Sequence, residues 1–225
     1  MPAAYDNYDY PAYWEGREYE HSSEFLAIRK LLSKVPKIDR SIEIGAGFGR
    51  LLPSYQFIVK KIVLSDPSAK LISKTRIKYK HNKNVEFIQS TLDNIKNSKK
   101  AKSFDLCIMV RVLHHIEDID KAFSNIHSLL KNRGYFILEF PNKSHLKANI
   151  KKIFSGDFTY PLNIFPIDIR SKRNVKHNTL PFINYHPDQI VEKLKLAGFE
   201  IIEVRSVSNI RSTFMKRFFP LSFLL

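Results

Sequence analysis

A glycine-rich turn carries the clearest chemical signal in this sequence. Gly45, Gly47 and Gly49 alternate directly after a short apolar run, and they are three of only seven glycines in the chain. Alternating glycines let the backbone turn sharply from a strand into a helix while it passes close to a ligand. The first amides of that helix then face polar groups of the ligand. We therefore expect the turn, with Glu43 and Ala46, to bind a small ligand.

The spacing of the turn and its leading acid argue against a dinucleotide. A dinucleotide fingerprint reads G-x-G-x-x-G, but Arg50 stands where its last glycine would fall. A carboxylate at Glu43 would repel phosphates, whereas it can hold an ammonium or, through water, a sulfonium. Asp66 follows Gly45 by 21 residues, the separation expected for an acid on ribose hydroxyls. A second interpretation of Asp66 is a cap for the helix that begins near Ser68.

Short apolar runs alternate with helical patterns along most of the chain. The pattern predicts six strands, over Ser41–Ile44, Lys61–Ser65, Val85–Ile88, Phe104–Val110, Tyr135–Phe140 and Phe199–Val207. It predicts helices over Glu20–Val35, Gly49–Val59, Ser68–Tyr79, Ile119–Leu130 and Pro187–Ala197. This alternation indicates an α/β fold with a doubly wound, mostly parallel sheet and helices on both faces.

Candidate site residues follow four of the predicted strands. They lie in Gly45–Gly49, at Asp66, in Gln89–Asp93 and in Val110–His115. Because ligands of such sheets bind outside the carboxyl ends of the strands, these segments should share one rim. His114 and His115 are candidates for a general base or for orienting a nucleophile. The alternative is a structural role at a helix start, and we expect no metal because no third ligand is close in sequence.

Five segments in register resemble the class I S-adenosylmethionine-dependent methyltransferases of the type 11 and type 25 kind. Glu43-Ile-Gly-Ala-Gly-Phe-Gly is similar to their first motif, and residues 64–68, 87–93, 104–118 and 129–139 match later motifs in order. The resemblance covers about residues 40–140. It implies a Rossmann-like fold, S-adenosylmethionine as cofactor, and direct methyl transfer to a substrate nucleophile.

The resemblance also implies a role for each matching residue. Glu43, Gly45 and Gly47 would lie at the methionine end of the cofactor, and Arg17 of the N-terminal arm would pair with its carboxylate. Asp66, followed by Pro67, would hold the ribose. Thr91 and Leu92 would border the adenine, although Thr91 stands where the family often has an Asp. Val110 and Arg111 would form the floor of the pocket.

We expect one domain over residues 1–225, in four parts. These are an N-terminal arm and helix (1–36), the cofactor-binding core (37–140), a lid or substrate insertion (141–186), and a last helix, strand and C-terminal tail (187–225). The insertion contains several prolines, many basic residues and no sustained periodicity, a pattern typical of lids. Asp188 is expected to cap the last helix beside Pro187.

The net charge of +15 is concentrated in residues 70–102 and 143–176. A basic face of this kind attracts nucleic acid, anionic lipid or a phosphorylated substrate, but a solvated lysine-rich surface is the interpretation we favour. The favoured function is methyl transfer to an O, N or C atom of a small molecule. An RNA or protein methyltransferase and a non-catalytic cofactor-binding module remain alternatives. Val110-Arg-Val-Leu replaces the Asn/Asp-Pro-Pro-Tyr motif of many amino-directed nucleic-acid methyltransferases.

The composition and the two terminal segments indicate where the protein is located and what its surface contacts. The single cysteine, Cys107, excludes an intrachain disulfide and fits a reducing compartment. The N-terminal residues lack the apolar run of a signal peptide, and no stretch approaches the roughly 20 apolar residues of a membrane span. We therefore expect a cytoplasmic protein. Its apolar C-terminus, residues 214–225, is a candidate for peripheral membrane contact or a dimer contact. The oligomeric state and the methyl acceptor stay open.

Overall fold

A parallel sheet of five strands organises the chain. The computed structural model describes residues 6, 9–96, 102–177, 179–210 and 213–225. The strands follow the order β3-β2-β1-β4-β5, and each neighbouring pair is parallel. They are β1 (Ile38–Ile44), β2 (Val59–Asp66), β3 (Val85–Gln89), β4 (Phe104–Val110) and β5 (Leu130–Glu139). The strand order reverses between β1 and β4, where ligands of doubly wound sheets bind.

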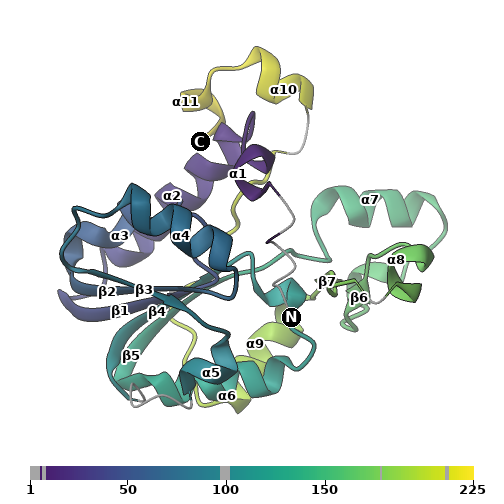
Figure 1. Cartoon of the computed structure of the whole chain (residues 1–225). Coiled ribbons are helices and arrows are strands. Elements are labelled where there is room, and N and C mark those ends of the chain that lie inside the picture. Colours follow the sequence, from purple (N-terminus) through teal and green to yellow (C-terminus); the bar gives the residue numbers. More distant parts are fainter. Residues whose placement is uncertain (1–5, 7–8, 97–101, 178, 211–212) are drawn as a thin grey trace.

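Helices cover both faces of the sheet (Figure 1). One face carries α2 (Glu18–Leu32), α3 (Leu52–Tyr55) and α4 (Ala69–Lys78). The other carries α5 (Leu92–Lys96), α6 (Ile119–Leu129) and α9 (Pro187–Leu196). The predicted doubly wound α/β fold is therefore confirmed.

The central strands are apolar on both faces because each face has its own core. Along β4, Cys107 and Met109 join the core under α6, while Ile108 and Val110 join the core under α2 and α3. Successive side chains of a strand point to opposite faces, so a strand covered on both sides needs an unbroken apolar run. This packing keeps the carboxyl ends of β1, β2 and β4 at one fixed rim.

The largest differences from the predicted element boundaries concern α3 and β5. The helix expected over 49–59 begins only at Leu52, because Gly49 has a φ of +70° and cannot belong to it. A 3₁₀ turn, η1 (Gln56–Ile58), follows α3. Strand β5 starts at Leu130 rather than Tyr135, and its register shifts between Phe104 and Leu106 of β4.

The predicted cap of the last helix was wrong. His186, rather than Asp188, caps α9, because its ring nitrogen accepts a hydrogen bond from the Asp188 amide at 3.3 Å. Asp188 instead lies in the first turn of α9, where a carboxylate faces the positive end of the helix dipole.

The prediction of a strand over Phe199–Val207 was also wrong. Residues 199–210 have no regular secondary structure, and β5 forms the edge of the sheet. A groove separates the two segments, because residues of β5 and of 199–209 line the same hollow. The chain ends in α10 (Thr213–Phe218) and α11 (Leu221–Leu224), which packs near α2.

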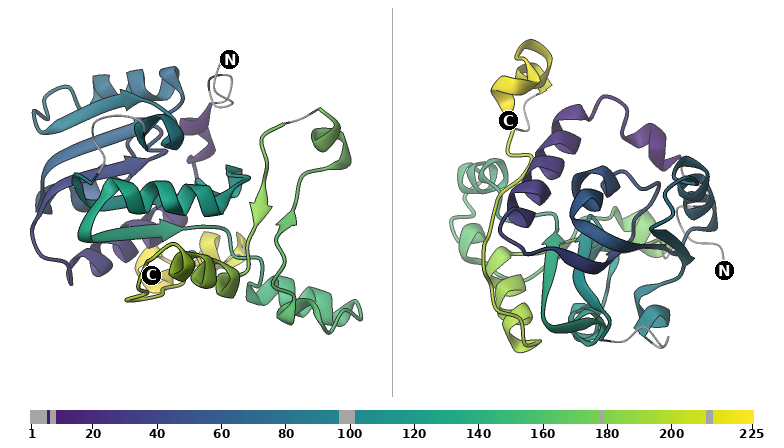
Figure 2. Two further views of the ribbon diagram at one scale, coloured as in Figure 1. Left: turned by 90° about the horizontal axis from the view of Figure 1, so that it is seen from below. Right: turned by 90° about the vertical axis from the view of Figure 1, so that its left-hand side faces the viewer.

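The insertion has more regular structure than its sequence indicated. It contains α7 (Leu146–Phe154), η3 (Tyr160–Leu162), β6 (Ile167–Asp168), α8 (Lys172–Lys176) and β7 (Ile183–Asn184). Strands β6 and β7 form an antiparallel pair, and the insertion projects away from the sheet (Figures 1 and 2). Its role as a lid stays a prediction. Among the helices of the described residues, none is long and apolar enough to cross a membrane.

Candidate cofactor and acceptor site

The glycine-rich turn after β1 has no space for side chains at two of its positions. A Cβ on Gly45 would lie 2.3 Å from Val112 Cγ2, and one on Gly49 would lie 2.7 Å from Tyr79 Cε2. Both glycines also have a φ of +70°, which other residues rarely adopt. The turn is therefore packed tightly between the end of β4 and α4, and the backbone around Gly47 forms the rim.

Asp66, at the end of β2, ties this turn in place. Its carboxylate accepts hydrogen bonds from the amides of Gly47 and Ser68, both at 2.8 Å. Burial raises the pKa of Asp66, and the two amide hydrogen bonds oppose that rise. A carboxylate has about four acceptor positions, so two remain for a ligand's hydroxyls. The cap of α4 is Ser68, whose hydroxyl accepts from Leu71 N at 3.1 Å.

Glu43 has a protein partner. The Tyr55 hydroxyl of α3 donates a hydrogen bond to the Glu43 carboxylate, and both side chains are buried. Burial raises the pKa of Glu43 to about 7, although the Tyr55 hydrogen bond and Arg50 lower it. The resemblance implied a contact between Glu43 and the methionine end, whereas the side chain here contacts α3 beneath the turn. In this geometry Glu43 supports the backbone that follows it.

The segment expected to border the adenine lies beside Asp66. The Ser90 amide donates to the Asp66 carbonyl at 3.1 Å, and Gln89 Nε2 donates to the Pro67 carbonyl at 3.3 Å. Thr91 is exposed, and its hydroxyl accepts from Asn94 N at 3.4 Å at the start of α5. Leu92 packs against the core. The predicted ribose and adenine segments therefore meet at the ends of β2 and β3.

Arg111 links the end of β4 to the end of β5. Its φ is +56°, an uncommon conformation for a residue with a side chain, and such conformations concentrate at functional sites. The Arg111 amide donates to the carboxylate of Glu139 at 3.0 Å. Burial and the Glu24 carboxylate raise the pKa of Glu139 to about 7, and Arg111 opposes them. Glu139 and Val110 line the groove described below.

A buried ion-pair network lies behind Arg111. The Glu24 side chain, 1% exposed, accepts from Arg50 at 2.5 Å and from Arg111 at 2.6 Å. Both guanidinium groups lie over the ring of Trp14, at 3.6 and 4.9 Å from its centroid. Sequence reasoning missed this network. A signal was present, because Glu24 occupies the apolar face of its helix four residues before Ile28.

The N-terminal arm lies over the glycine-rich turn. In α1 (Tyr10–Tyr13), the Tyr10 ring lies 3.3 Å from the position of a Cβ on Gly47. Tyr10 also makes edge contacts with Phe48 and Trp14. Arg17, the predicted partner of the cofactor carboxylate, stacks on Tyr13 with its Cζ 4.1 Å from the ring centroid. Tyr10, Tyr13 and Arg17 line the same groove as Arg111.

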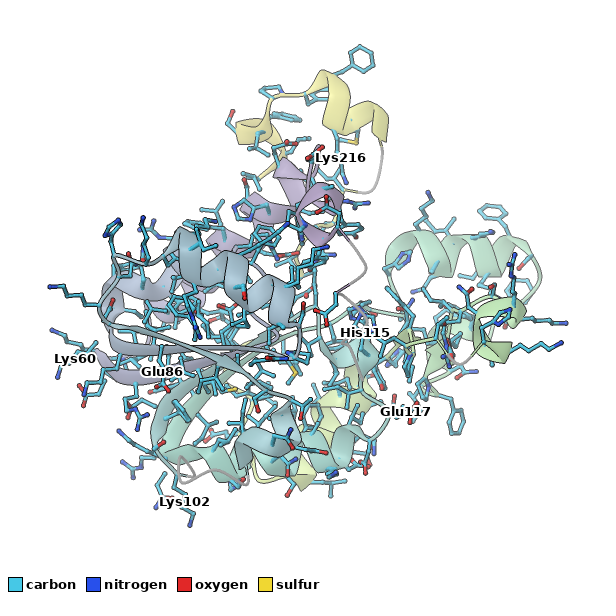
Figure 3. All side chains as sticks on the ribbon, viewed as in Figure 1. Lys60, Glu86, Lys102, His115, Glu117 and Lys216 are labelled. Carbon is cyan, nitrogen blue, oxygen red and sulfur yellow. The ribbon has the colours of Figure 1, made fainter. Side chains whose placement is uncertain are left out.

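His114 and His115 lie in η2 (Leu113–His115). Figure 3 shows His115 where the insertion joins the core. Their ring centroids are 3.9 Å apart, and the Phe182 ring lies 4.4 Å from His114. His115 Nδ1 is 2.7 Å from the Pro181 carbonyl, while His114 Nδ1 is buried without a hydrogen-bond partner. Burial, with help from His115 and Arg111, lowers the pKa of His114 to about 3. His114 is therefore a neutral imidazole at neutral pH.

One groove connects these groups. It starts between the arm and Arg111, passes both histidines and the base of the insertion, and continues along β5. Its volume of about 3420 Å³ exceeds the roughly 300–1,000 Å³ of a typical ligand pocket. It is therefore a long open groove that one small molecule would fill only in part. Within the described residues, no group of three or more His, Cys, Asp or Glu side chains has a metal-binding arrangement.

These features fit S-adenosylmethionine. The two remaining acceptor positions of Asp66, which holds the buried Gly47 amide, suit the hydroxyls of an adenosine ribose. Tyr10 and Tyr13 add aromatic rings to the same groove, and aromatic rings attract cations such as a sulfonium. The residues of the rim therefore match the chemistry of this cofactor.

Comparison with known proteins agrees with this geometry. The profile of the methyltransferase domain family matches residues 42–138. The ubiquinone biosynthesis O-methyltransferase of Pelagibacter ubique (strain HTCC1062) is 26% identical over 164 residues, which cover 72% of this chain and 66% of that protein. The reducing polyketide synthase BOA6 of Botryotinia fuckeliana (strain B05.10) is 28% identical over 135 residues, 56% of this chain but only 5% of that protein. The chain thus spans less than two thirds of either relative.

Solved structures show the same fold. An S-adenosylmethionine-dependent methyltransferase from Mesorhizobium loti superposes with a TM-score of 0.58 at 17% identity, covering 80% of this chain and 83% of that one. The matching family profile confirms the predictions of family and cofactor, and the superposition confirms the fold. The core of this chain, residues 42–138, is a methyltransferase domain of the class I S-adenosylmethionine-dependent, Rossmann-like family.

Proposed function

We propose that this protein transfers a methyl group from S-adenosylmethionine to an O, N or C atom of a small molecule bound in the groove. The observation that carries the proposal is the groove itself, which begins beside the cofactor rim at Val110 and Arg111. Bound S-adenosylmethionine supplies an electrophilic methyl group on a sulfonium. The acceptor side of that methyl must be open to a second molecule, and the groove meets this requirement.

The proposed roles on the cofactor side follow the contacts at the rim. Asp66 holds the ribose with the acceptor positions that Gly47 and Ser68 leave available. Thr91 and Leu92 border the adenine beside Asp66. Arg17 and the arm enclose the methionine end, with Arg111 below. Glu43 acts as a positioning residue through Tyr55.

Two groups on the acceptor side have contrasting chemistry. His114, with a pKa of about 3, is a weak base, so we assign it to contact the acceptor as a neutral ring that lines the groove. Glu139, with a pKa of about 7, is better matched to removing a proton near neutral pH. An acceptor that is already nucleophilic needs only in-line positioning and exclusion of water.

The lining of the groove favours a small acceptor with an apolar, aromatic part. Phe140, Phe182 and Leu180 line it together with the two histidines. The relative from Pelagibacter ubique is an O-methyltransferase of ubiquinone biosynthesis, which supports oxygen as the target atom. A cytoplasmic location and a peripheral contact through the C-terminus remain parts of this proposal.

A screen for S-adenosylhomocysteine release tests the proposed function. Phenols, catechols, amines and sugar derivatives are offered with S-adenosylmethionine, while calorimetry measures cofactor binding separately. We expect at least one phenolic acceptor to release product, with Glu139→Gln lowering kcat more than it changes cofactor affinity. Cofactor binding without any turnover across all classes would favour a non-catalytic module. Absence of cofactor binding would contradict the proposal itself.

A further inference from the structure

The outer part of the insertion exposes an unusual amount of apolar surface. We call residues 150–177 the insertion tip. Of the 22 large apolar side chains that are exposed in the described part of the chain, 11 belong to the insertion. The most exposed are Phe154 (89%), Leu162 (82%), Phe165 (73%) and Phe158 (72%). Exposed apolar surface at this density marks an interaction site.

Cations surround these apolar side chains. Lys151, Lys172, Arg173 and Lys176 are exposed, and no carboxylate of the described residues lies within ion-pair distance of them. The two acids of the tip already have partners. Asp168 pairs with Arg170 at 2.6 Å, and Asp157 lies 3.8 Å from Lys152. The tip therefore has a strong positive charge beside its apolar surface.

A buried lysine holds the most exposed apolar segment in position. Lys143 is 2% exposed, and its Nζ donates to the Asn163 carbonyl (2.6 Å), the Asn163 side chain (2.9 Å) and the Phe165 carbonyl (2.7 Å). These three bonds fix the backbone on either side of Ile164 while Leu162 and Phe165 face solvent. The apolar display is therefore a built feature of the insertion.

Helix α7 adds an amphipathic surface to the tip. Ile150, Ile153 and Phe154 recur at helical spacing, and all three are exposed. Lys147 and Lys151 lie next to this apolar stripe. A helix with an exposed apolar stripe flanked by lysines has the pattern of helices that lie in the interface of a membrane.

We propose that the insertion tip docks on an anionic lipid surface. Its phenylalanine and aliphatic side chains enter the boundary between headgroups and acyl chains, and its cations face the acidic headgroups. Hydrophobic insertion and charge attraction act together here, as stable peripheral binding requires two signals. The tip lies away from the sheet (Figure 2), so a membrane could reach it without contact with the core.

The kinds of apolar side chain favour lipid over RNA. Single-stranded RNA is held by stacking its bases on aromatic rings. The tip does expose three phenylalanines, but Leu162, Ile164, Ile169 and Val175 are aliphatic and cannot stack on bases in this way. The ring of Tyr160 is already occupied, because Lys143 and Lys152 each lie 5.2 Å from its centroid. Aliphatic side chains do enter hydrocarbon favourably, which fits a lipid surface.

Docking would also bring the groove toward the membrane. The base of the insertion, including Phe182 and Asn142, lines the groove beside the histidines. A membrane-dissolved acceptor could then enter the groove along the insertion. This consequence rests on the proposed function, whereas the docking itself rests only on the surface of the tip.

Vesicle flotation tests the docking without any need for catalysis. The full chain is mixed with vesicles of phosphatidylcholine, or of phosphatidylcholine and phosphatidylglycerol in equal parts. One variant places acids in the apolar turn, Leu162→Asp with Phe165→Asp. A second removes cations, Lys172→Ala with Arg173→Ala. The matched controls are Ile77→Asp with Leu196→Asp, at side chains 71% and 79% exposed outside the insertion, and Lys74→Ala with Lys80→Ala.

We expect the protein to float with the anionic vesicles and to stay in solution with pure phosphatidylcholine. Each tip variant should lower vesicle binding by roughly tenfold or more, since each cation near the surface contributes about fivefold. The controls should bind like the unchanged protein, and circular dichroism should show that all variants fold. Equal binding by the tip variants would overturn the proposal. Binding that is lost in Phe223→Asp but kept in the tip variants would assign the contact to the C-terminus and would also overturn the proposal. Binding of an RNA oligonucleotide that competes with vesicles would do the same.

Discussion

Replacement of Glu24 by Gln tests the ion-pair network beneath Trp14. The substitution keeps the size of the side chain but removes its charge, leaving Arg50 and Arg111 without their shared carboxylate. Removing one partner of a buried ion pair costs about 3–5 kcal/mol of folding stability. Gln retains one carbonyl oxygen, which can accept from one of the two guanidinium groups. We therefore expect a loss of about 3 kcal/mol, at the lower end of that range.

Urea unfolding followed by the fluorescence of Trp14 measures this loss. Trp14 is the only tryptophan of the chain and lies directly over Arg50, so its emission reports on the network itself. The matched control is Asp120→Asn, which removes a carboxylate that is 65% exposed and accepts two hydrogen bonds from Lys193. That change should cost no more than about 1 kcal/mol. Equal losses for both variants would refute the idea that burial gives the Glu24 network its strength.

Three further predictions concern single site residues. Asp66→Ala should weaken S-adenosylmethionine binding by roughly 1–3 kcal/mol in calorimetry, because a charge-assisted hydrogen bond is lost; unchanged affinity would remove Asp66 from the site. Burial raises the pKa of Glu139 from 4.5 to about 7. The Glu139 carboxyl therefore contributes to the free energy of unfolding below pH 4.5, and this contribution is lost as the pH rises through 7. Glu139→Gln should remove that change, on the order of 3 kcal/mol, from urea unfolding at pH 5 and pH 8. With the pKa of His114 near 3, the rate of methyl transfer should show no inflection near pH 6.5 that depends on His114. An inflection there that disappears in His114→Gln would contradict the role assigned to His114.

The parallel sheet and the position of the rim were predictable from local patterns. Buried parallel strands need continuous apolar runs, and β4 has one from Leu106 to Val110. The turn at Gly45 was predictable because alternating glycines have few other uses. Asp66 was identified by its distance from that turn along the chain. These signals are all local, because the fold requires each of these residue types at a fixed position along the chain.

The remaining features depend on contacts between distant segments. Glu24 joins Arg50 and Arg111 across α2, the glycine-rich turn and β4, and no local pattern encodes that meeting. The segment after Phe199 has a strand-like sequence, yet a strand also needs a partner, and β5 does not pair with it here. The cap of α9 depends on one hydrogen bond, which the Asp188 amide donates to the His186 ring. The raised pKa of Glu139 likewise reflects burial that only the folded chain creates.

The free edge of β5 has a consequence for the behaviour of the whole molecule at high concentration. Five consecutive residues of this strand, Tyr135–Glu139, pair with β4 on one side, and no described strand pairs with their other side. An open edge of that length is a template on which another chain can add a strand and begin aggregation. The start of β5 opposes such addition, because the pairing is irregular between Leu130 and Tyr135, Arg133 has a φ of +61°, and Lys131 and Arg133 are charged. Solubility of this protein should therefore depend on Lys131 and Arg133, which lie at the opposite end of β5 from the cofactor rim.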